Sequence, residues 1–276
     1  QAHMAGHPNT SGLNTIDYFI SSELIEAENS QRFYTEQLVC LTKLTSTMRR
    51  PKLPEKKAKR GEIGLPDDSI LIGIPHTLFK IHPDFDEVLE EIAQGTGNIK
   101  YILIETPNIF LAQKLKERWK KSAPTTLSKS LFLESMPMER FLMLLSHLDL
   151  ILDPFYFGSG TVFYHAMSVG TPVVSMPTVQ MRSRTVMAGY KQMKISNPPI
   201  AINKDEYVGW CLKLVKSSRE RDGLRRKFQQ AAQSYLFDDQ EVLDEWKQFI
   251  ESAVEYASRD ERLPIGWRPS ITANFT

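Results

Sequence analysis

The sequence has few cysteines and no long hydrophobic run. Its 276 residues include two cysteines, Cys40 and Cys211, whose spacing fits neither a metal site nor a redox motif. We expect both to be reduced, buried side chains in a cytoplasmic protein. No apolar segment approaches the roughly 20 residues that span a bilayer, and no signal-peptide pattern opens the chain. These absences argue against a membrane protein.

An excess of charge of one sign is also missing. The chain carries 34 basic and 33 acidic residues, a formal net charge of +1. This balance argues against a dedicated nucleic-acid-binding protein. The hydrophobic fraction of 41% is enough for a packed core, and the length fits one large or two modest domains. Because the sequence starts at Gln1, we expect a fragment or a processed chain.

Short apolar runs alternate with amphipathic segments along the middle of the chain. We expect strands at residues 69–74, 99–104, 130–133, 148–152 and 172–176. We expect helices at residues 83–94, 108–121, 137–147 and 161–169, and a tail that is helical throughout residues 205–257. This alternation predicts an α/β fold with a parallel, doubly wound sheet.

Changes in composition divide the chain into four parts. Residues 1–48 look like the end of a preceding domain, with a strand at residues 16–20 and a helix at residues 28–44. Residues 49–68 are rich in proline and lysine, and we interpret them as a solvated basic linker rather than an anion-binding segment. Residues 69–235 form the predicted α/β domain, and residues 236–276 form a C-terminal helix and tail.

The segment after the predicted strand at residues 148–152 carries the most informative functional pattern. It reads Asp153-Pro154-Phe155-Tyr156-Phe157-Gly158-Ser159-Gly160-Thr161, a glycine-bearing loop between a strand and a helix. Gly158 and Gly160 would let the backbone approach a ligand closely. The N–H groups of Gly160, Thr161 and Val162 would lie at a helix N-terminus, whose partial positive charge suits a diphosphate. An ordinary strand–helix turn is the alternative.

Three other segments follow predicted strands, where the ligands of open α/β sheets bind. Lys80 stands just before the helix that Pro83 begins, and it could meet a phosphate as a point charge or be a surface lysine. The turn at residues 134–137 could present free backbone groups to the edge of a base. Arg182 and Arg184 could neutralise an anion, although a solvated helix start is an equal alternative.

Taken together, these segments resemble one family, the protein O-GlcNAc transferases and SPINDLY proteins, which are GT-B glycosyltransferases. In the C-terminal domain of that family, the matching parts are the glycine loop, Val169-Gly170-Thr171-Pro172-Val173-Val174 and Met181-Arg182-Ser183-Arg184. Before and after residues 148–184, the matching parts are Leu78-Phe79-Lys80-Ile81-His82-Pro83, Gly6-His7-Pro8-Asn9-Thr10-Ser11-Gly12 and Leu236-Phe237-Asp238-Asp239. No single motif is decisive, but the ordered set covers nearly the whole chain.

The resemblance implies a fold and a place for each part of the chain. The α/β domain would be the Rossmann-like, nucleotide-sugar-binding domain of a GT-B protein, and residues 1–48 would end its N-terminal, acceptor-side catalytic domain. In GT-B proteins the C-terminal helix often crosses back onto the N-terminal domain. We nevertheless favour packing of the apolar face of the helix at residues 239–257 on the α/β domain, with exposure or partner binding as alternatives.

The resemblance also implies roles for particular residues. Lys80 would contact the donor diphosphate, and His7 would lie with Thr10 and Ser11 on a loop that faces the donor sugar and the acceptor. Arg184 would lie close to the cleft between the domains. The remaining donor-binding residues would be Gly158, Gly160, Thr161 and Val162 at the phosphates and Ser135, Met136, Pro137 and Phe141 at the base.

One position departs from the family pattern. The family usually has an acidic residue, which accepts hydrogen bonds from the ribose hydroxyls, where this chain has His165. A neutral histidine accepts through one ring nitrogen only, so we expect ribose binding to be altered or weakened. A half-buried helix histidine without a ligand role is the alternative.

The resemblance implies an inverting GT-B glycosyltransferase that moves a sugar from a nucleoside diphosphate to a protein Ser or Thr side chain, or to Asn. UDP-GlcNAc and UDP-glucose are the favoured donors, and a GDP-sugar is less favoured. No metal or other cofactor is required. The partners would be the donor, a protein acceptor and the rest of the catalytic or repeat domains, without which we expect the isolated chain to be inactive.

Three other functions stay open. The chain could be a non-catalytic nucleotide-sugar-binding module, with His165 as the sign of a decayed site. It could be a sugar-nucleotide epimerase of the same fold, although no set of catalytic carboxylates and histidines is evident. It could also be a plain α/β protein-interaction domain in which the glycine loop is only a turn.

Overall fold

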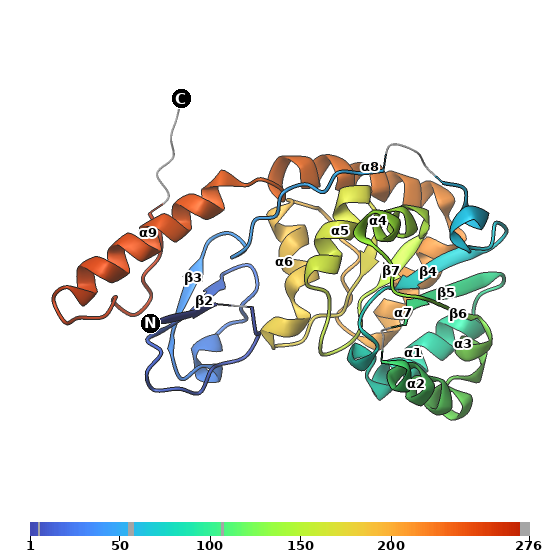
Figure 1. Cartoon of the computed structure of the whole chain (residues 1–276), viewed down its shortest axis with the longest axis horizontal. Coiled ribbons are helices and arrows are strands. Elements are labelled where there is room, and N and C mark those ends of the chain that lie inside the picture. Colours follow the sequence, from blue (N-terminus) through green and yellow to red (C-terminus); the bar gives the residue numbers. More distant parts are fainter. Residues whose placement is uncertain (5, 55–57, 106–107, 271–276) are drawn as a thin grey trace.

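The computed structural model describes residues 1–4, 6–54, 58–105 and 108–270 (Figure 1). The undescribed residues 55–57 belong to the predicted basic linker, and residues 271–276 belong to the predicted tail. Two parallel sheets are present, one of three strands and one of five. The predicted α/β class is therefore confirmed.

The larger sheet has the strand order β6-β5-β4-β7-β8, and every pairing in it is parallel. Its strands are β4 (Ile70–Ile74), β5 (Ile99–Ile104), β6 (Ser130–Leu133), β7 (Leu150–Leu152) and β8 (Val173–Val174). β4, β7 and β8 are almost wholly apolar because helices cover both faces of the sheet, whereas the edge strand β6 is only half-buried.

The order of the strands reverses between β4 and β7. From β4 the chain moves outward through β5 to β6, and it then returns to the other side of β4 to form β7 and β8. The loops that leave the carboxyl ends of β4 and β7 border one surface, the crevice, at this reversal. Ligands of open α/β sheets bind at such a switch point.

Eight helices pack around the larger sheet in the described residues. They are α1 (Pro83–Gln94), α2 (Ile109–Ser122), α3 (Pro124–Ser128), α4 (Met138–His147), α5 (Thr161–Val169), α6 (Thr185–Gln192), α7 (Lys204–Lys216) and α8 (Ser218–Tyr235). The predictions for α1 and α5 are confirmed to the residue, and those for α2 and α4 within one residue at each end. The tail is not helical throughout, because Ser217 and residues 236–239 interrupt it, and α6 was not predicted.

The smaller sheet is built from residues 1–41 and has the order β1-β2-β3. Its strands are β1 (Ala2–Met4), β2 (Tyr18–Ser22) and β3 (Gln37–Leu41). The predicted strand lies two residues too early, and the predicted helix at residues 28–44 is wrong. A short 3-10 turn, Ser30–Phe33, and β3 occupy that segment, because β3 pairs with β2 over five residues. This tertiary pairing overrides the local helical spacing.

Helix α9 (Gln240–Ala257) crosses from the end of α8 to the smaller sheet (Figure 1). The Phe249 ring meets Tyr18 edge to face at a centroid distance of 5.7 Å, and Trp246 Nε1 donates to the Thr45 carbonyl at 2.8 Å. The expectation that α9 packs on the α/β domain is therefore wrong. Its apolar face is needed to cover Tyr18, Ile20, Val39 and Leu41 of the smaller sheet.

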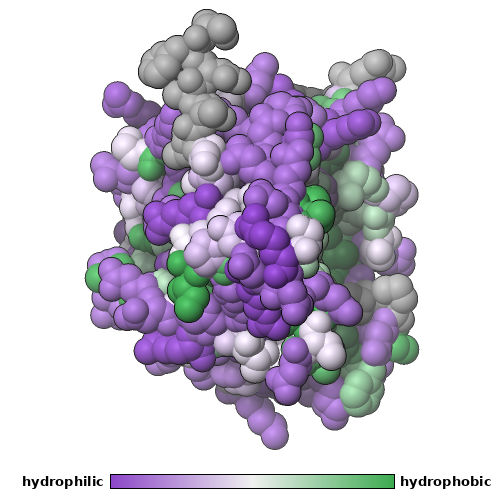
Figure 2. All heavy atoms as spheres, turned by 90° about the vertical axis from the view of Figure 1, so that its left-hand side faces the viewer, coloured by the Kyte–Doolittle hydropathy of each residue, from purple (hydrophilic) through white to green (hydrophobic). Residues whose placement is uncertain are grey.

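Part of the apolar surface of α9 remains open to solvent. Ile250 and Val254 are 54% and 64% exposed. Figure 2 shows that this side of the molecule is mainly hydrophilic, with hydrophobic residues in small, separate patches. Among the described residues, no helix combines the length and the apolar character that crossing a bilayer requires.

A few polar contacts join the two sheets. The guanidinium of Arg184 donates through Nε to the Ile25 carbonyl, and Tyr164 donates its hydroxyl to the Ser46 carbonyl at 3.1 Å. Gln192 accepts from the backbone N–H of Leu44 at 2.7 Å. The two units are thus held in one arrangement around the crevice.

Candidate functional site

Two segments that lie 78 residues apart meet at the switch point. Lys80 ends a short 3-10 turn, Leu78–Lys80, after β4, and Gly158 lies in the loop after β7. Lys80 Nζ donates to the Gly158 carbonyl at 2.8 Å and lies 4.2 Å from the centroid of the Phe157 ring. The structure therefore brings together the lysine and the glycine loop that the sequence indicated separately.

A buried carboxylate lies beneath this loop. Asp153 directly follows β7 and is 2% exposed. Its Oδ1 accepts from the backbone N–H of Ser159 at 2.6 Å and from the Ser159 hydroxyl at 2.7 Å. Its Oδ2 accepts from the Ser175 hydroxyl, next to the end of β8, at 2.6 Å. Asp153 thus ties the loop to two strand ends, and sequence reasoning missed this role.

Gly158 is fixed on three sides. Its N–H donates to the Arg182 carbonyl at 3.0 Å, and its own carbonyl accepts from Lys80. A Cβ at this position would lie 2.5 Å from Asp153 Oδ2, which is closer than real Cβ contacts. The loop wraps so tightly around the carboxylate that a glycine is required there.

The N-terminus of α5 is open. Its N-cap is Gly160, which supplies no side-chain cap, and the first turn holds no acidic residue. Gly160 and Thr161 are exposed, and in the described chain the N–H groups of Thr161 and Val162 have no acceptor. Unpaired donors and the helix dipole therefore present partial positive charge to solvent beside Lys80.

Burial shifts the pKa values of the ionisable groups at the switch point. It lowers the pKa of Lys80, and the negative charge of Asp153 opposes this shift. Burial raises the pKa of Asp153 in turn, although its hydrogen bonds and the charge of Lys80 counteract the shift. His76 lies next to them with Nε2 4.0 Å from Asp153 Oδ1. Burial and the charge of Lys80 lower its pKa to about 3, so its ring is neutral.

The residues predicted to contact the base lie between β6 and α4. Ser135 and Pro137 are exposed, and Met136 packs against the core that α4 and α5 share. Phe141 of α4 meets His165 of α5 edge to face, with ring centroids 5.8 Å apart. The structure therefore brings Phe141 and His165 together. Within the described ranges, no hydrogen bond joins the Ser135 side chain to the glycine loop.

His165 is 9% exposed, and burial lowers its pKa, so its imidazole is neutral at pH 7. Its ring forms no hydrogen bond to another described residue, and the carbonyl of His165 accepts from the Ser168 hydroxyl. An uncommitted ring nitrogen is therefore present one turn into the helix that starts at Thr161.

The Arg184 guanidinium makes two hydrogen bonds. Its Nε donates to the Ile25 carbonyl and its Nη1 to the Thr178 carbonyl at 2.8 Å, and burial lowers its pKa. Its contact with Ile25 places it between the two units, as a position near the cleft requires, and its Nη2 has no partner in the described residues. The neighbouring Arg182 has a buried Nε with no partner in the described residues. The sequence indicated both arginines as candidates for binding an anion, and no pattern in it favoured one over the other.

His7 is exposed on the loop between β1 and β2. Glu36 anchors this loop, because its carboxylate accepts from the Thr10 hydroxyl at 2.6 Å and from the Ser11 backbone N–H at 2.7 Å. A cavity of about 250 Å³ separates the loop from Gln180 and Met181, and Thr10 lines it. The predicted loop residues thus lie beside the segment that carries Arg182. Sequence reasoning missed Glu36, whose partners are 25 residues away.

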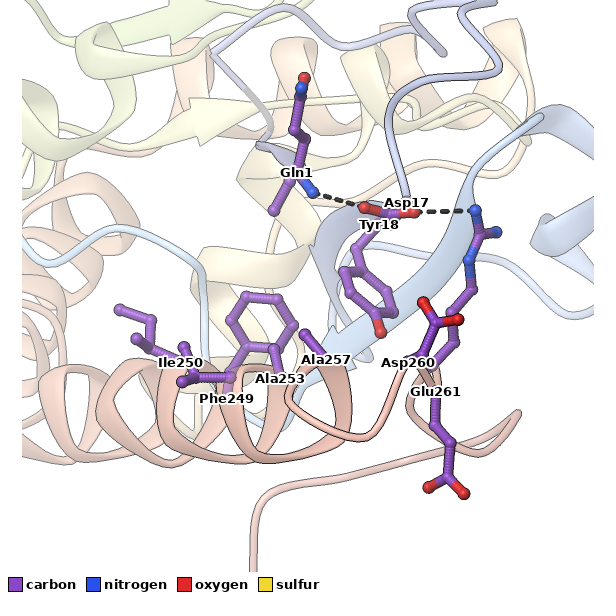
Figure 3. Close-up of a pocket in the computed structure, with 12 residues that line it drawn as sticks. Gln1, Asp17, Tyr18, Phe249, Ile250, Ala253, Ala257, Asp260 and Glu261 are labelled. Carbon is purple, nitrogen blue, oxygen red and sulfur yellow. Dashed lines mark hydrogen bonds and ion pairs between the residues drawn. The ribbon is translucent and has the colours of Figure 1, made fainter.

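A larger cavity of about 540 Å³ lies elsewhere, between β2 and α9 (Figure 3). Its walls include Tyr18 and Phe249, and Asp17 at its rim pairs with the Gln1 amine and with Arg262. Asp17 is therefore paired with two cationic groups, and the cavity lies away from the switch point. Across the ranges that the structure describes, no three His, Cys, Asp or Glu side chains are grouped to hold a metal ion.

No family model matches the sequence. A probable UDP-N-acetylglucosamine–peptide N-acetylglucosaminyltransferase SPINDLY of Solanum lycopersicum is 25% identical over 234 residues. A UDP-glucose:protein N-beta-glucosyltransferase of Actinobacillus pleuropneumoniae is 25% identical over 238 residues. Each match covers 82% of this chain. The resemblance to the O-GlcNAc transferase and SPINDLY family is confirmed.

Solved structures agree on the fold. A mutant of the Thermobaculum terrenum O-GlcNAc transferase superimposes with a TM-score of 0.78 at 20% identity, over 94% of this chain and 48% of its own. The fold is therefore of the GT-B type. The chain spans 24% of the tomato SPINDLY relative and 36% of the bacterial glucosyltransferase, roughly a quarter to a third of their lengths.

Proposed function

We propose that this chain binds the diphosphate of a nucleoside-diphosphate sugar in the crevice between β4 and β7. It would act as the donor-binding half of an inverting protein glycosyltransferase. One observation carries the proposal: the Lys80 amine is fixed 2.8 Å from the Gly158 carbonyl, beside the uncapped N-terminus of α5. A cation and free N–H groups converge there, which is the chemistry that a diphosphate needs.

In such a transfer, the acceptor oxygen or nitrogen forms a bond to the anomeric carbon while the bond from that carbon to the diphosphate breaks. The electron pair leaves with the diphosphate, and a base on the acceptor side takes the acceptor proton. Lys80 and the N–H groups of Thr161 and Val162 would stabilise the charge that develops on the leaving diphosphate. This half supplies electrostatic stabilisation from groups already in place and forms no covalent bond itself.

A diphosphate in the crevice also suggests roles for the other predicted donor-binding residues. Phe141, with Ser135, Met136 and Pro137, would line the base, and the free ring nitrogen of His165 would meet the ribose. We favour UDP over GDP, and a sugar of the GlcNAc or glucose type, because the names of the similar proteins specify UDP-N-acetylglucosamine and UDP-glucose. The same names support a peptide or protein acceptor that is modified at a hydroxyl or amide. His7 stays our candidate for contact with the transferred sugar.

We further propose that the 276 residues alone bind the donor without transferring its sugar. The basis is that the chain spans 48% of the bacterial O-GlcNAc transferase whose fold it shares. We place the protein in the cytoplasm, because Cys40 and Cys211 are both free thiols, as is usual in a reducing compartment.

The test is calorimetric titration of the chain with UDP and with GDP, repeated on Lys80→Ala. We expect UDP to bind, and Lys80→Ala to weaken binding by about 1.5 to 3 kcal/mol, the value of one hydrogen bond to a charged group. Lys129→Ala is the matched control, because Lys129 also donates to backbone carbonyls but does so at the C-terminal end of α1.

Lys129→Ala should bind UDP as the wild type does. Equal affinity of Lys80→Ala and wild type would refute the proposed site, and failure of both nucleotides to bind would refute the donor-binding function of this chain. Preference for GDP would leave the proposed site in place and would mean that the donor is a GDP-sugar.

A further inference from the structure

The geometry points to Asp153 as the positioning residue of the crevice, which shapes the phosphate-facing loop and holds Lys80 as an ammonium ion. This inference rests on the proposed function and extends it to a residue that would not touch the ligand. Asp153 lies underneath the loop rather than at its surface, with 2% of its area exposed.

The first argument is the shape of the loop. All three donors that meet Asp153 point inward, and they are the Ser159 N–H, the Ser159 hydroxyl and the Ser175 hydroxyl, each at 2.6 or 2.7 Å. Because the Ser159 N–H is drawn inward, the following N–H groups at Thr161 and Val162 remain outside, where a ligand can reach them. A carboxylate accepts at both oxygens, so its ionised form suits this set of donors.

The second argument is how little room the loop leaves. Gly158 passes so close to the carboxylate that a Cβ would lie 2.5 Å from Oδ2 and 2.9 Å from Oδ1. The carbonyl of that same glycine accepts from Lys80 Nζ. Carboxylate, loop and lysine therefore form one packed unit, and a change in Asp153 is transmitted to Lys80 through Gly158.

The third argument is charge. No carboxylate lies within 4.0 Å of Lys80 Nζ in the part of the chain that the structure describes, so its positive charge is not consumed by an ion pair. Asp153 still acts on it at longer range and counteracts the loss of charge that burial favours. The other ionisable neighbours are His76, which is neutral, and Arg182, whose carbonyl accepts from Gly158.

The experiment compares Asp153→Asn with the wild type in two measurements. The first follows the Lys80 side chain by NMR through a pH titration without nucleotide, and Lys80→Ala identifies its signal. The second measures UDP affinity against pH. Removing the negative charge lowers the pKa of Lys80, so the ammonium form is lost at lower pH. We expect the Lys80 midpoint to fall, and UDP affinity to decline at a lower pH in Asp153→Asn than in the wild type.

Asp86→Asn is the matched control. Asp86 is equally buried at 2% exposed, and it accepts from Arg118, Trp119 and Ser122, away from the crevice. Asp86→Asn should lower the free energy of unfolding without changing the Lys80 titration midpoint or the UDP affinity. A folded Asp153→Asn protein with the wild-type Lys80 midpoint and wild-type affinity would overturn the inference, as would equal shifts in Asp86→Asn.

Two further variants keep the inference testable if Asp153→Asn does not fold. Ser159→Ala retains the charge and removes one loop contact, so UDP affinity should fall severalfold while the Lys80 midpoint stays in place. Lys80→Ala should raise the titration midpoint of the Asp153 carboxyl, because the coupling is reciprocal. Absence of both effects would overturn the inference. If wild-type chain binds no UDP, the proposed function fails, yet the nucleotide-free titrations still decide the role of Asp153.

Discussion

At the scale of single residues, one hydrogen bond joins the Lys80 amine to the Gly158 carbonyl and so links the loops that follow β4 and β7. Both residues stand in recognisable segments after predicted strands, so both could be chosen in advance. No sequence pattern favoured Arg184 over Arg182 as the anion-binding residue. The commitment of Arg184 to the Ile25 carbonyl depends on a contact across 159 residues, which no local pattern carries.

Gly158 allows a direct test of the packed loop. We expect Gly158→Ala to lower the free energy of unfolding by about 1 to 3 kcal/mol, because the added methyl group would overlap the Asp153 carboxylate. Nucleotide affinity should fall as well, since the loop must move. Urea unfolding and calorimetry measure the two effects. Gly97→Ala is the control, because nothing lies within 4 Å of the position that a Cβ would occupy there, and it should change neither quantity.

Glu36 gives a pH-dependent prediction. Burial alone would raise its pKa, but hydrogen bonds from Ser11 and Thr10 outweigh burial and lower the pKa from 4.5 to about 2. A lowered carboxyl pKa stabilises the fold above the unfolded-state pKa, and this stabilisation is lost as pH falls from about 4.5 towards 2. We expect Glu36→Gln to cost about 1 to 2 kcal/mol at pH 7 and progressively less below pH 4.5.

Urea unfolding of wild type and Glu36→Gln at several pH values between 7 and 2 measures this difference. A difference in stability that stays constant over the whole range would contradict the assignment of the lowered pKa to Glu36.

At the scale of whole elements, the strands of the larger sheet were predictable because each is a short, mainly apolar run, and those at its centre are buried on both faces. Strand β3 was not, because residues 28–44 also show helical spacing and only pairing with β2 decides between the two. Helix α9 was predicted as a helix, but its docking surface was not. The partner of its apolar face is a sheet more than 200 residues earlier in the chain, as the contact of Trp246 with Thr45 shows.

Phe249 tests the docking of α9 on the smaller sheet. It is 3% exposed and packs against Tyr18, so Phe249→Ala should cost about 3 kcal/mol or more. Hydrogen exchange should show lost protection in β2 and β3, with β4 and β5 unchanged. Ile250→Ala removes the exposed neighbour on the same helix and should have little effect. Uniform loss of protection over both sheets would contradict a separate role for α9.

At the scale of the whole molecule, the strand order of the larger sheet places the crevice between β4 and β7, and the smaller sheet with α9 forms a second unit joined to it by contacts such as Arg184 with Ile25. The sequence predicted the fold class and the identity of the glycine loop. It could not predict how the smaller sheet, α9 and the loop at residues 6–12 are arranged around the crevice, because those contacts depend on residues far apart in the chain.

A crystal structure of this chain with UDP tests the central claim most directly. The account predicts diphosphate oxygens within about 3 Å of Lys80 Nζ and of the Thr161 N–H, the usual length of a charge-assisted hydrogen bond. Nucleotide bound instead in the cavity of about 340 Å³ that Met143 and Arg225 line, where Val169 ends α5, would contradict it.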